Sequence, residues 1–426
     1  MNETLLVANA SFNGGMVDVL AENGVFARIA PAGTINTVAT HTIDAAGAII
    51  APAFYNTHTH AAMSFLRGYA DDLELFSWLQ NHIWPAESKL TSGMIQAASQ
   101  MAILEMIHSG TVFFNDMYFE PVETLKAAEH LGVRAAVGRM FMDNGAPGAW
   151  ERSLRSTEEL EEHYANSSAK ARLSLTWAPH AIYTMSEKAL RWIAEQRERT
   201  GDMLHIHLSE TVRENEECER AHGMSPAAWL DHCGLLGPFT ILAHCVHLSD
   251  ADRVLIRERG AAIASCPNSN AKLCSGIFDF ERTVGKFGCR TSLATDGNAS
   301  NNSLSMFSEM KAMALLAKIR SGNPETAPAE KVWEIATSGG AQAFGLNAGR
   351  IAEGCLADCI LLRRDAIQLL PGYSLASDMV YSADTAVVDT VVCAGRILMR
   401  NGVVPGEDEI ISGFRSMFPG KRKNGK

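Results

Sequence analysis

The chain has 426 residues, of which 47% are apolar, and it carries a formal net charge of −11. This length can bury a large core in one or two domains, and the acidic balance disfavours nucleic-acid polymers and anionic membranes as partners. Nine cysteines without a Cys-x-x-Cys pair indicate neither a disulfide framework nor a cysteine metal site. No stretch reaches transmembrane length, and the N-terminus lacks the pattern of a secretory signal, so we expect a cytoplasmic protein.

Residues 1–51 consist of short β-type runs separated by Gly and Asn turns. From residue 52 the pattern changes to strands that alternate with helices. The eight expected strands lie within residues 47–60, 110–119, 133–143, 171–180, 202–210, 239–248, 260–269 and 289–297. Eight βα units in succession favour an α/β fold with a closed (β/α)8 TIM-type barrel, which we assign to residues 52–349.

Residues 350–426 return to β-type runs with turn glycines and no helical period. We therefore expect residues 1–51 and 350–426 to form together one small β-sandwich domain, which the barrel interrupts. The only basic cluster of the chain, at residues 421–423, lies in a terminal tail.

Polar residues stand where the expected barrel strands end. Because active sites of such barrels lie at the carboxyl ends of the strands, these positions are the first candidates for function. They are His58 and His60, Asn115 and Asp116, Arg139, His180, His207 with Glu210, His244, Asn268 and Asp296.

His58 and His60 are two apart on one strand, so their imidazoles face the same side, about 6.6 Å apart along the backbone. They form half of a metal site, or else an exposed polar edge. His207 ends the fifth strand, opposite this pair, whereas His205 is deeper and is better explained as a core histidine. Asp296 ends the eighth strand, next to the first in a closed barrel, although it could also be a turn residue before glycine. Three histidines and one carboxylate leave an open position for water, as in hydrolytic metal sites.

Five segments together resemble the amidohydrolase superfamily, in its branch of aromatic deaminases and chlorohydrolases. They are "NTHTHAAMSFLRGYADDLELFSWL", "HLSET", "AHCVHL", "LATDGNASNNSLSMF" and "GGAQAFGLNAGRIAEGCLADCILL". Within this branch the chain is most similar to the 5′-methylthioadenosine/S-adenosylhomocysteine deaminases. The resemblance implies one divalent metal ion, usually zinc, bound by His58, His60, His207 and Asp296. Iron or manganese would also suit these ligands.

The resemblance also implies roles for Glu210, His244 and Asp296. Glu210 would protonate a ring nitrogen of the substrate, His244 would orient and stabilise the attacking water, and Asp296 would accept its proton. A solvated loop residue is the alternative for Glu210, and a structural strand-end residue is the alternative for His244.

For the substrate, the resemblance assigns Glu87 to the ribose hydroxyls, Trp78 to the pocket wall, and His180 to a substrate contact. Glu87 could instead be a surface charge that opens the next helix, and Trp78 could be core packing. Guanidinium groups suit a carboxylate, and the resemblance places Arg139 and Arg152 where relatives hold the amino-acid carboxylate of S-adenosylhomocysteine. Arg155 could replace Arg152, and each arginine could form a structural ion pair instead.

The sequence therefore predicts hydrolytic deamination of a small purine nucleoside, either 5′-methylthioadenosine, S-adenosylhomocysteine or a close relative. The alternatives are another hydrolase of the same branch, acting on guanine, a pterin or a triazine, and a non-catalytic barrel that serves as a binding module. A homo-oligomer is compatible with the sequence.

Overall fold

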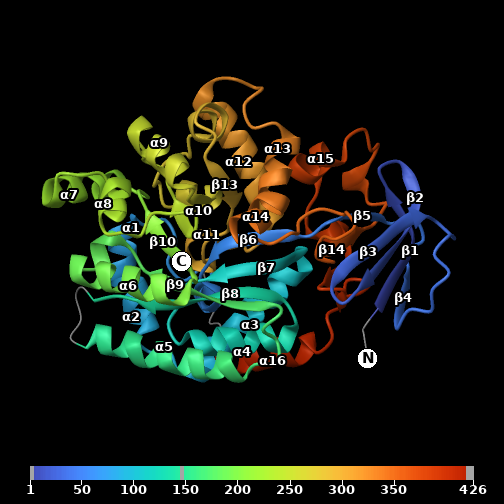
Figure 1. Cartoon of the computed structure of the whole chain (residues 1–426), viewed down its shortest axis with the longest axis horizontal. Coiled ribbons are helices and arrows are strands. Elements are labelled where there is room, and N and C mark those ends of the chain that lie inside the picture. The colour runs from blue at the N-terminus through green and yellow to red at the C-terminus, as the bar shows by residue number, and fades with distance from the viewer. Residues whose placement is uncertain (1–3, 144–147, 419–426) are drawn as a thin grey trace, which may run out of the picture.

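A computed structural model describes residues 4–143 and 148–418, so the basic cluster at residues 421–423 lies outside the described part. The chain forms a barrel and, beside it, a sheet built from the two terminal segments (Figure 1). The barrel sheet runs in sequence order through eight parallel strands. These strands are β6 (Phe54–Thr59), β7 (Thr111–Asp116), β8 (Arg134–Phe141), β9 (Leu173–Pro179), β10 (Met203–Leu208), β11 (Thr240–His244), β12 (Ala262–Ser265) and β13 (Arg290–Leu293). The predicted (β/α)8 barrel is confirmed.

The first and last strands of the barrel meet through side-chain and backbone hydrogen bonds. Asn56 donates from Nδ2 to Oγ1 of Thr295 over 2.7 Å, and its Oδ1 accepts from the Thr295 amide over 3.1 Å. One step further, the Asp296 amide donates to the carbonyl of His58 over 3.1 Å. This closure brings the carboxyl ends of β6 and β13 to one place, as a closed barrel requires.

Helices follow the barrel strands and cover the outside of the barrel (Figure 1). The longer ones are α3 (Ser92–His108), α4 (Pro121–Leu131), α5 (Ala149–Asn166), α6 (Glu187–Thr200), α7 (Val212–His222), α8 (Pro226–His232), α9 (Asp250–Arg259) and α12 (Met306–Ser321). Shorter segments are η1 (Ala61–Leu66), α1 (Leu75–Trp78), η2 (Leu79–Ile83), α2 (Trp84–Glu87), η3 (Ile182–Thr184), α10 (Pro267–Lys272), η4 (Glu281–Lys286), α11 (Asn298–Asn301), α13 (Ala329–Glu334), η5 (Ile335–Gly339) and α14 (Gly340–Ala343).

Local sequence sets the ends of these helices, as α6 illustrates. The Ser186 side chain accepts a hydrogen bond from the Ala189 amide, so it satisfies one of the free N–H groups of the first turn. At the other end Gly201 adopts the left-handed conformation, with φ of 74°, which a side chain would strain. The helix therefore begins and ends where the sequence predicts it.

The terminal segments share one eight-stranded sheet. Its strands are β1 (Thr4–Phe12), β2 (Gly15–Glu22), β3 (Val25–Pro31), β4 (His41–Asp44), β5 (Ile49–Pro52), β14 (Cys359–Leu362), β15 (Val388–Cys393) and β16 (Arg396–Met399). The link between the two segments is the antiparallel pair β5 and β14, in which Ala51 lies opposite Ile360. Leu5 and Phe26 from the first segment pack in one core with Leu361 and Val392 from the second. The predicted small β domain of both chain ends is thus present.

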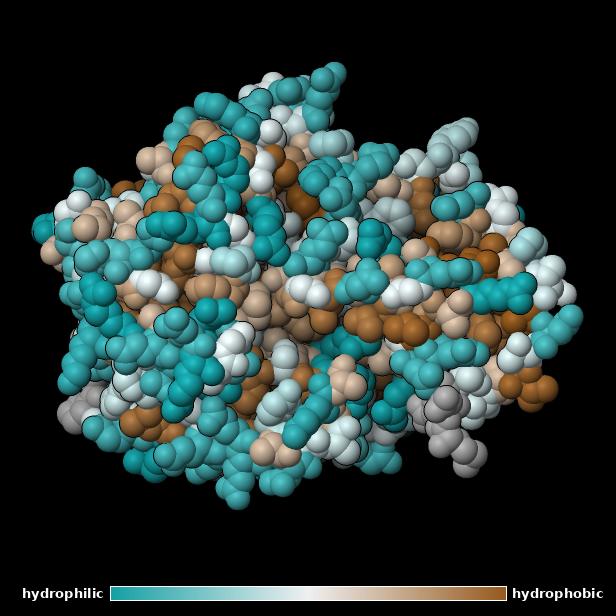
Figure 2. All heavy atoms as spheres, viewed as in Figure 1, coloured by the Kyte–Doolittle hydropathy of each residue, from teal (hydrophilic) through white to brown (hydrophobic). Residues whose placement is uncertain are grey.

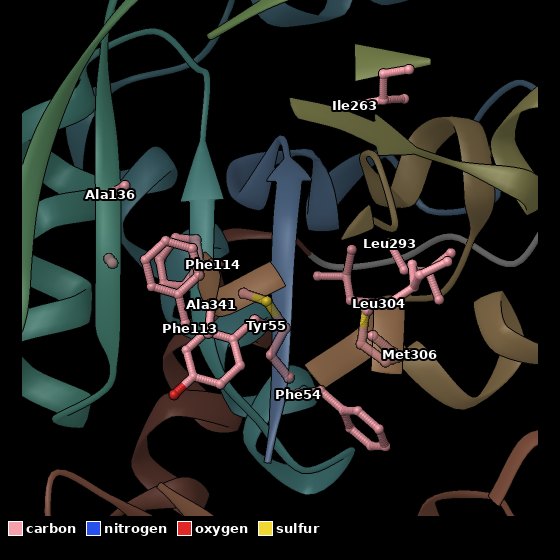
Figure 3. Packing of buried hydrophobic residues seen from close by; sticks show 14 of the residues in the cluster. Phe54, Tyr55, Phe113, Phe114, Ala136, Ile263, Leu293, Leu304, Met306 and Ala341 are labelled. Atoms are coloured by element: carbon pink, nitrogen blue, oxygen red, sulfur yellow. The ribbon is translucent and has the colours of Figure 1, made fainter. Parts of the chain in front are cut away.

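A buried ion pair joins this β domain to the bottom of the barrel. Asp358, directly before β14, accepts hydrogen bonds from Nε of Arg134 on β8 over 2.8 Å and from the hydroxyl of Tyr55 on β6 over 2.5 Å. Tyr55 is surrounded by the apolar side chains of the barrel core, among them Phe113 and Ala341 (Figure 3). Because Asp358 and Arg134 are buried, each compensates the charge of the other.

After β14 and again after β16, the C-terminal segment returns to the barrel. The segments η6 (Ile367–Leu369), α15 (Leu375–Ser377), η7 (Asp378–Ser382) and η8 (Thr385–Val387) follow β14, and α16 (Glu407–Met417) follows β16. Helix α16 packs on α3, where His108 and Glu407 form an ion pair of 2.8 Å. Residues after 350 are therefore not confined to the β domain.

Polar residues cover most of the outer helices on the face shown in Figure 2. In the described part of the chain, no helix combines the length and the apolar character needed to cross a bilayer.

Candidate metal centre and active site

Three histidines and one aspartate meet at the carboxyl ends of β6, β10 and β13. The Nε2 atoms of His58 and His60 lie 3.3 Å and 3.2 Å from Oδ1 of Asp296. The Nε2 atom of His207 lies 3.3 Å from that of His60, and one ligand atom from each histidine falls within 4.8 Å of the others. The structure therefore brings the four predicted ligands together, and nearly all of their surface is buried.

Hydrogen bonds fix which ring nitrogen of each histidine faces this space. His60 Nδ1 lies 2.5 Å from the Met117 carbonyl, and His207 Nδ1 lies 2.6 Å from the His180 carbonyl. A carbonyl only accepts, so both Nδ1 atoms carry hydrogen, and each ring directs an Nε2 lone pair inward when it is neutral. The buried Nε2 of His58 has no hydrogen-bond partner. Lone pairs and a carboxylate at these distances favour a cation between them, and this nitrogen-oxygen set suits a divalent metal ion.

The pKa values of these histidines show which rings are neutral and which one binds a proton beside Asp296. Burial lowers the pKa of His58 to about 4 and that of His207 well below its usual value, so these rings are neutral, as metal ligands must be. For His60 burial also favours the neutral ring, but the hydrogen bond and charge of Asp296 raise its pKa to about 9. A cation bound at the centre of the site would replace the proton that His60 otherwise holds.

Asp296 has a strained backbone conformation, and its Oδ2 atom, which does not face the histidines, accepts two hydrogen bonds. Its φ of 60° is left-handed, which is uncommon for a residue with a side chain. The hydroxyls of Ser269 and Ser300 donate to Oδ2 over 2.6 Å and 2.7 Å, so Oδ1 is left to face the histidines. Ser269 lies on α10 and Ser300 on α11, directly after β12 and β13.

Glu210 and His244 lie beside the metal ligands. The Nε2 atom of His244 is 3.8 Å from Oε2 of Glu210, and its Nδ1 is 2.8 Å from Oδ1 of Asn270. The Ser275 hydroxyl donates to Oε1 of Glu210 over 3.1 Å. Burial raises the pKa of Glu210, so this carboxyl can hold a proton closer to neutral pH than a solvated glutamate. The pair can therefore move a proton next to the metal site.

Glu214, on the first turn of α7, holds the turn that carries Glu210. Its two carboxylate oxygens accept from the amides of Ser209 and Glu210 over 2.9 Å and 2.8 Å. Ser209 has a left-handed φ of 49°, so the turn after β10 is unusual and needs this support.

A cavity that is open to solvent lies above the candidate metal site. Its lining includes Glu87, Trp78 and His180, which the sequence assigns to the substrate, as well as Glu210 and His244. The hydroxyl of Tyr118, another lining residue, donates to Oε1 of Glu87 over 2.7 Å. Burial raises the pKa of Glu87 to about 7. The indole of Trp78 donates to the Ala70 carbonyl over 2.9 Å, so its ring serves as an apolar wall.

Arg139 lies elsewhere, which corrects its predicted place at the substrate. Its guanidinium forms ion pairs with Glu161 over 2.6 Å and Asp202 over 2.9 Å, and stacks 4.6 Å from the Trp177 ring centroid. Side chains alternate along a strand, and Met140, the next residue of β8, is the one that lines the cavity. Arg139 instead makes the structural ion pair that the sequence left as its alternative.

Arg152 and Arg155 lie on α5 with exposed side chains, and neither is among the described residues that line the cavity. Nη1 of Arg152 lies close to Gly148, the residue that precedes the helix. The structure therefore does not bring the predicted carboxylate-binding arginines together with Glu87 and Glu210.

Sequence reasoning missed the residues that position the site. They are Asn270, Ser269, Ser300, Glu214 and Glu309, of which the last accepts from Asn268 over 2.7 Å and from Asn301 over 2.6 Å. The segments "CPNSN" and "DGNASNN" that follow β12 and β13 hold most of them, so a concentration of Ser and Asn after strand ends was the available signal.

Comparison with known proteins agrees with this geometry. The model of the amidohydrolase family matches residues 49–398. The chain is 42% identical over 360 residues to a 5′-deoxyadenosine deaminase of Methanothermobacter thermautotrophicus, covering 84% of each chain. It is 40% identical over 371 residues to 5-methylthioadenosine/S-adenosylhomocysteine deaminase 1 of Archaeoglobus fulgidus, covering 86% of each. An adenosine deaminase from Xanthomonas campestris, solved with bound zinc, superposes with a TM-score of 0.90 at 28% identity over 97% of both chains.

The fold and the site thus define a barrel hydrolase of the metal-dependent type. The chain belongs to the amidohydrolase family, which confirms the resemblance seen in the sequence.

Proposed function

We propose that this chain catalyses hydrolytic deamination of an adenine nucleoside, either 5′-methylthioadenosine, S-adenosylhomocysteine or a close relative, to the inosine analogue and ammonia. The observation that carries the proposal is the pair Glu210 and His244, 3.8 Å apart, beside the converging metal ligands in one cavity. Curated relatives about 40% identical are named as deaminases of such nucleosides.

We assign one divalent ion, zinc before iron or manganese, to His58, His60, His207 and Asp296. When bound, such an ion lowers the pKa of a coordinated water toward neutrality. The histidine Nδ1–H groups keep the rings oriented for this role, since each ring is held by an acceptor behind it.

The side chains of this site can carry the proton transfers of the reaction. Protonated Glu210 donates its proton to N1 of the ring while Asp296 takes one from the attacking water and the water oxygen bonds to C6. His244, held by Asn270, hydrogen-bonds to the attacking oxygen. Glu210 then recovers the second water proton and Asp296 gives its proton to the amino group. The C6–N bond breaks, and the products are the oxo ring with a proton on N1 and one ammonia.

Glu87 would bind the ribose, because a carboxylate accepts hydrogen bonds from two vicinal hydroxyls. The Tyr118 hydroxyl, which donates to its Oε1, holds this carboxylate in the cavity wall. His180 and Trp78 would complete the wall around the nucleoside.

The test is ammonia release by the zinc-loaded protein from adenosine, 5′-deoxyadenosine, 5′-methylthioadenosine, S-adenosylhomocysteine, guanine and a pterin. We expect ammonia from the adenine nucleosides, loss of activity after chelation, and recovery when zinc is returned. Ammonia only from guanine or the pterin would assign the chain to the other branch members, and ammonia from none of the six would contradict the proposal.

A further inference from the structure

The charged residues that line the cavity are all acidic or histidine. Glu87, Glu210 and Asp296 are among the lining residues, and no lysine or arginine is, within the part of the chain that the structure describes. A substrate that carries its own carboxylate therefore meets the carboxyl groups of Glu87 and Glu210, and no lysine or arginine among the described lining residues.

The rest of the wall is mainly apolar and rich in methionine. Six of the other lining residues are Met63, Leu79, Met117, Phe119, Met140 and Met142. Met117, Met140 and Met142 pack together at the ends of β7 and β8. Thioethers are flexible and polarisable, so such a wall adapts to a small apolar group, whereas it leaves a buried carboxylate without hydrogen bonds.

Two arginines on elements next to the cavity have acidic partners. Arg139 points away from the cavity into its ion pairs with Glu161 and Asp202. On α7, the guanidinium of Arg213 lies 4.1 Å from the Phe76 ring centroid and pairs with Glu217 over 2.7 Å. Neither arginine is a lining residue of the cavity.

We infer that the methionine wall selects adenine nucleosides whose 5′ substituent is small and uncharged, such as methyl or methylthio, over those with a 5′ amino-acid group. This inference rests on the proposed function, of which it narrows the substrate class. A carboxylate that gains no ion pair loses the contribution of a charge-assisted hydrogen bond, so the expected preference in kcat/KM is about 10- to 100-fold.

The experiment measures kcat/KM of the zinc-loaded wild type on 5′-methylthioadenosine, 5′-deoxyadenosine and S-adenosylhomocysteine. We expect the first two to exceed the third by at least about 10-fold. Equal values for all three, or a preference for S-adenosylhomocysteine, would overturn the inference and leave the proposed function standing. Absence of ammonia from every adenine nucleoside would instead overturn the proposed function, and with it the inference.

Two variants test whether the methionine wall is the source of the substrate preference. Met142→Arg puts a cation at the half-buried end of β8, and we expect it to reduce the preference for 5′-methylthioadenosine over S-adenosylhomocysteine by about 10-fold. The control Met16→Arg, on the partly exposed β2 strand of the terminal sheet, should leave the preference unchanged. If both variants kept the wild-type preference, the methionine wall would not be its source.

Arg139→Gln and Arg213→Gln test the competing arginines. Loss of packing in either variant would lower kcat/KM for 5′-methylthioadenosine and for S-adenosylhomocysteine to the same extent. The measured quantity is therefore the ratio of these two kcat/KM values. We expect that ratio to stay within about 3-fold of the wild type, since neither guanidinium reaches the cavity. A selective loss of S-adenosylhomocysteine turnover in either variant would show that its arginine binds the carboxylate and would overturn the inference.

Discussion

The Nδ1 atom of His58 lies 2.7 Å from Nε2 of His205, in the buried centre of the barrel. His205 is two residues before His207 on β10 and points into the same space one layer deeper, so one strand supplies both a ligand and the support for another. With its Nδ1–H donated to His205, the His58 ring directs its Nε2 lone pair at the metal site.

His205 should therefore matter for metal affinity although it is not a ligand. We expect His205→Ala to weaken zinc binding about 10- to 100-fold, the usual effect of removing a partner behind a metal ligand. Competition with a chromogenic chelator measures the affinity, and the exposed His130→Ala on α4 is the control. Unchanged zinc affinity in the His205 variant would mean that His58 keeps its orientation without this contact.

Glu210 should contribute to the reaction rate and not to metal binding. Glu210→Gln removes the proton that the ring nitrogen needs, so we expect kcat to fall about 10²- to 10⁴-fold while zinc content stays at the wild-type level. Steady-state kinetics and metal analysis of the same sample check both. The exposed Glu216→Gln on α7 should behave as the wild type. Full turnover by the Glu210 variant would exclude the proton-transfer role.

Glu87 should act through the ribose hydroxyls. We expect Glu87→Gln to raise KM for a ribonucleoside about 10-fold or more, because it replaces two charge-assisted hydrogen bonds with weaker ones. A 2′,3′-dideoxy analogue lacks both hydroxyls, so its KM should be high with the wild type and nearly the same with the variant. If the variant raised KM equally for both substrates, Glu87 would not bind the ribose hydroxyls.

The ion pair between Asp358 and Arg134 should be important for stability. Asp358→Ala leaves a buried guanidinium and the Tyr55 hydroxyl without their acceptor, and we expect the free energy of unfolding to drop by about 3–5 kcal/mol. Denaturant unfolding measures the change. As the control, Asp389→Asn removes a more exposed pair with Arg363 and should cost about 1 kcal/mol or less. Equal effects of the two changes would contradict this ranking.

The buried Glu309 should make the free energy of unfolding depend on pH. Burial raises its pKa to about 8, despite the hydrogen bonds from Asn268 and Asn301, whereas the unfolded chain has the ordinary value near 4.5. Between these values the folded state holds a proton that the unfolded state does not, so this group destabilises the fold progressively as pH rises from about 4.5 to about 8.

Replacing the acid with its neutral isostere should remove that dependence. We expect the Tm of the wild type to fall relative to that of Glu309→Gln as pH is raised from about 5 to about 9. Differential scanning fluorimetry over that range measures it, with the exposed Glu258→Gln as control. Parallel curves for wild type and Glu309→Gln would show that Glu309 does not titrate in this range.

The sequence by itself predicted the barrel, the family and the four residues that the structure brings together as candidate metal ligands. Strand and helix periods are local, and the rule that active-site groups follow strand ends predicts that His58, His60, His207 and Asp296 lie close together. The same rule found Glu210 and His244, whose neighbours in space the sequence does not mark.

Only the tertiary structure decided which way Arg139 faces and which residues line the cavity. Position on a strand does not say which face a residue presents unless the register is known, and one step along β8 separates the outward Arg139 from the cavity-lining Met140. The partners of His58, Asp296 and His244 are likewise distant in sequence, at His205, Ser269 and Asn270, because they meet only when the barrel closes. Contacts between strand ends are set by packing of the whole barrel, which no local pattern encodes.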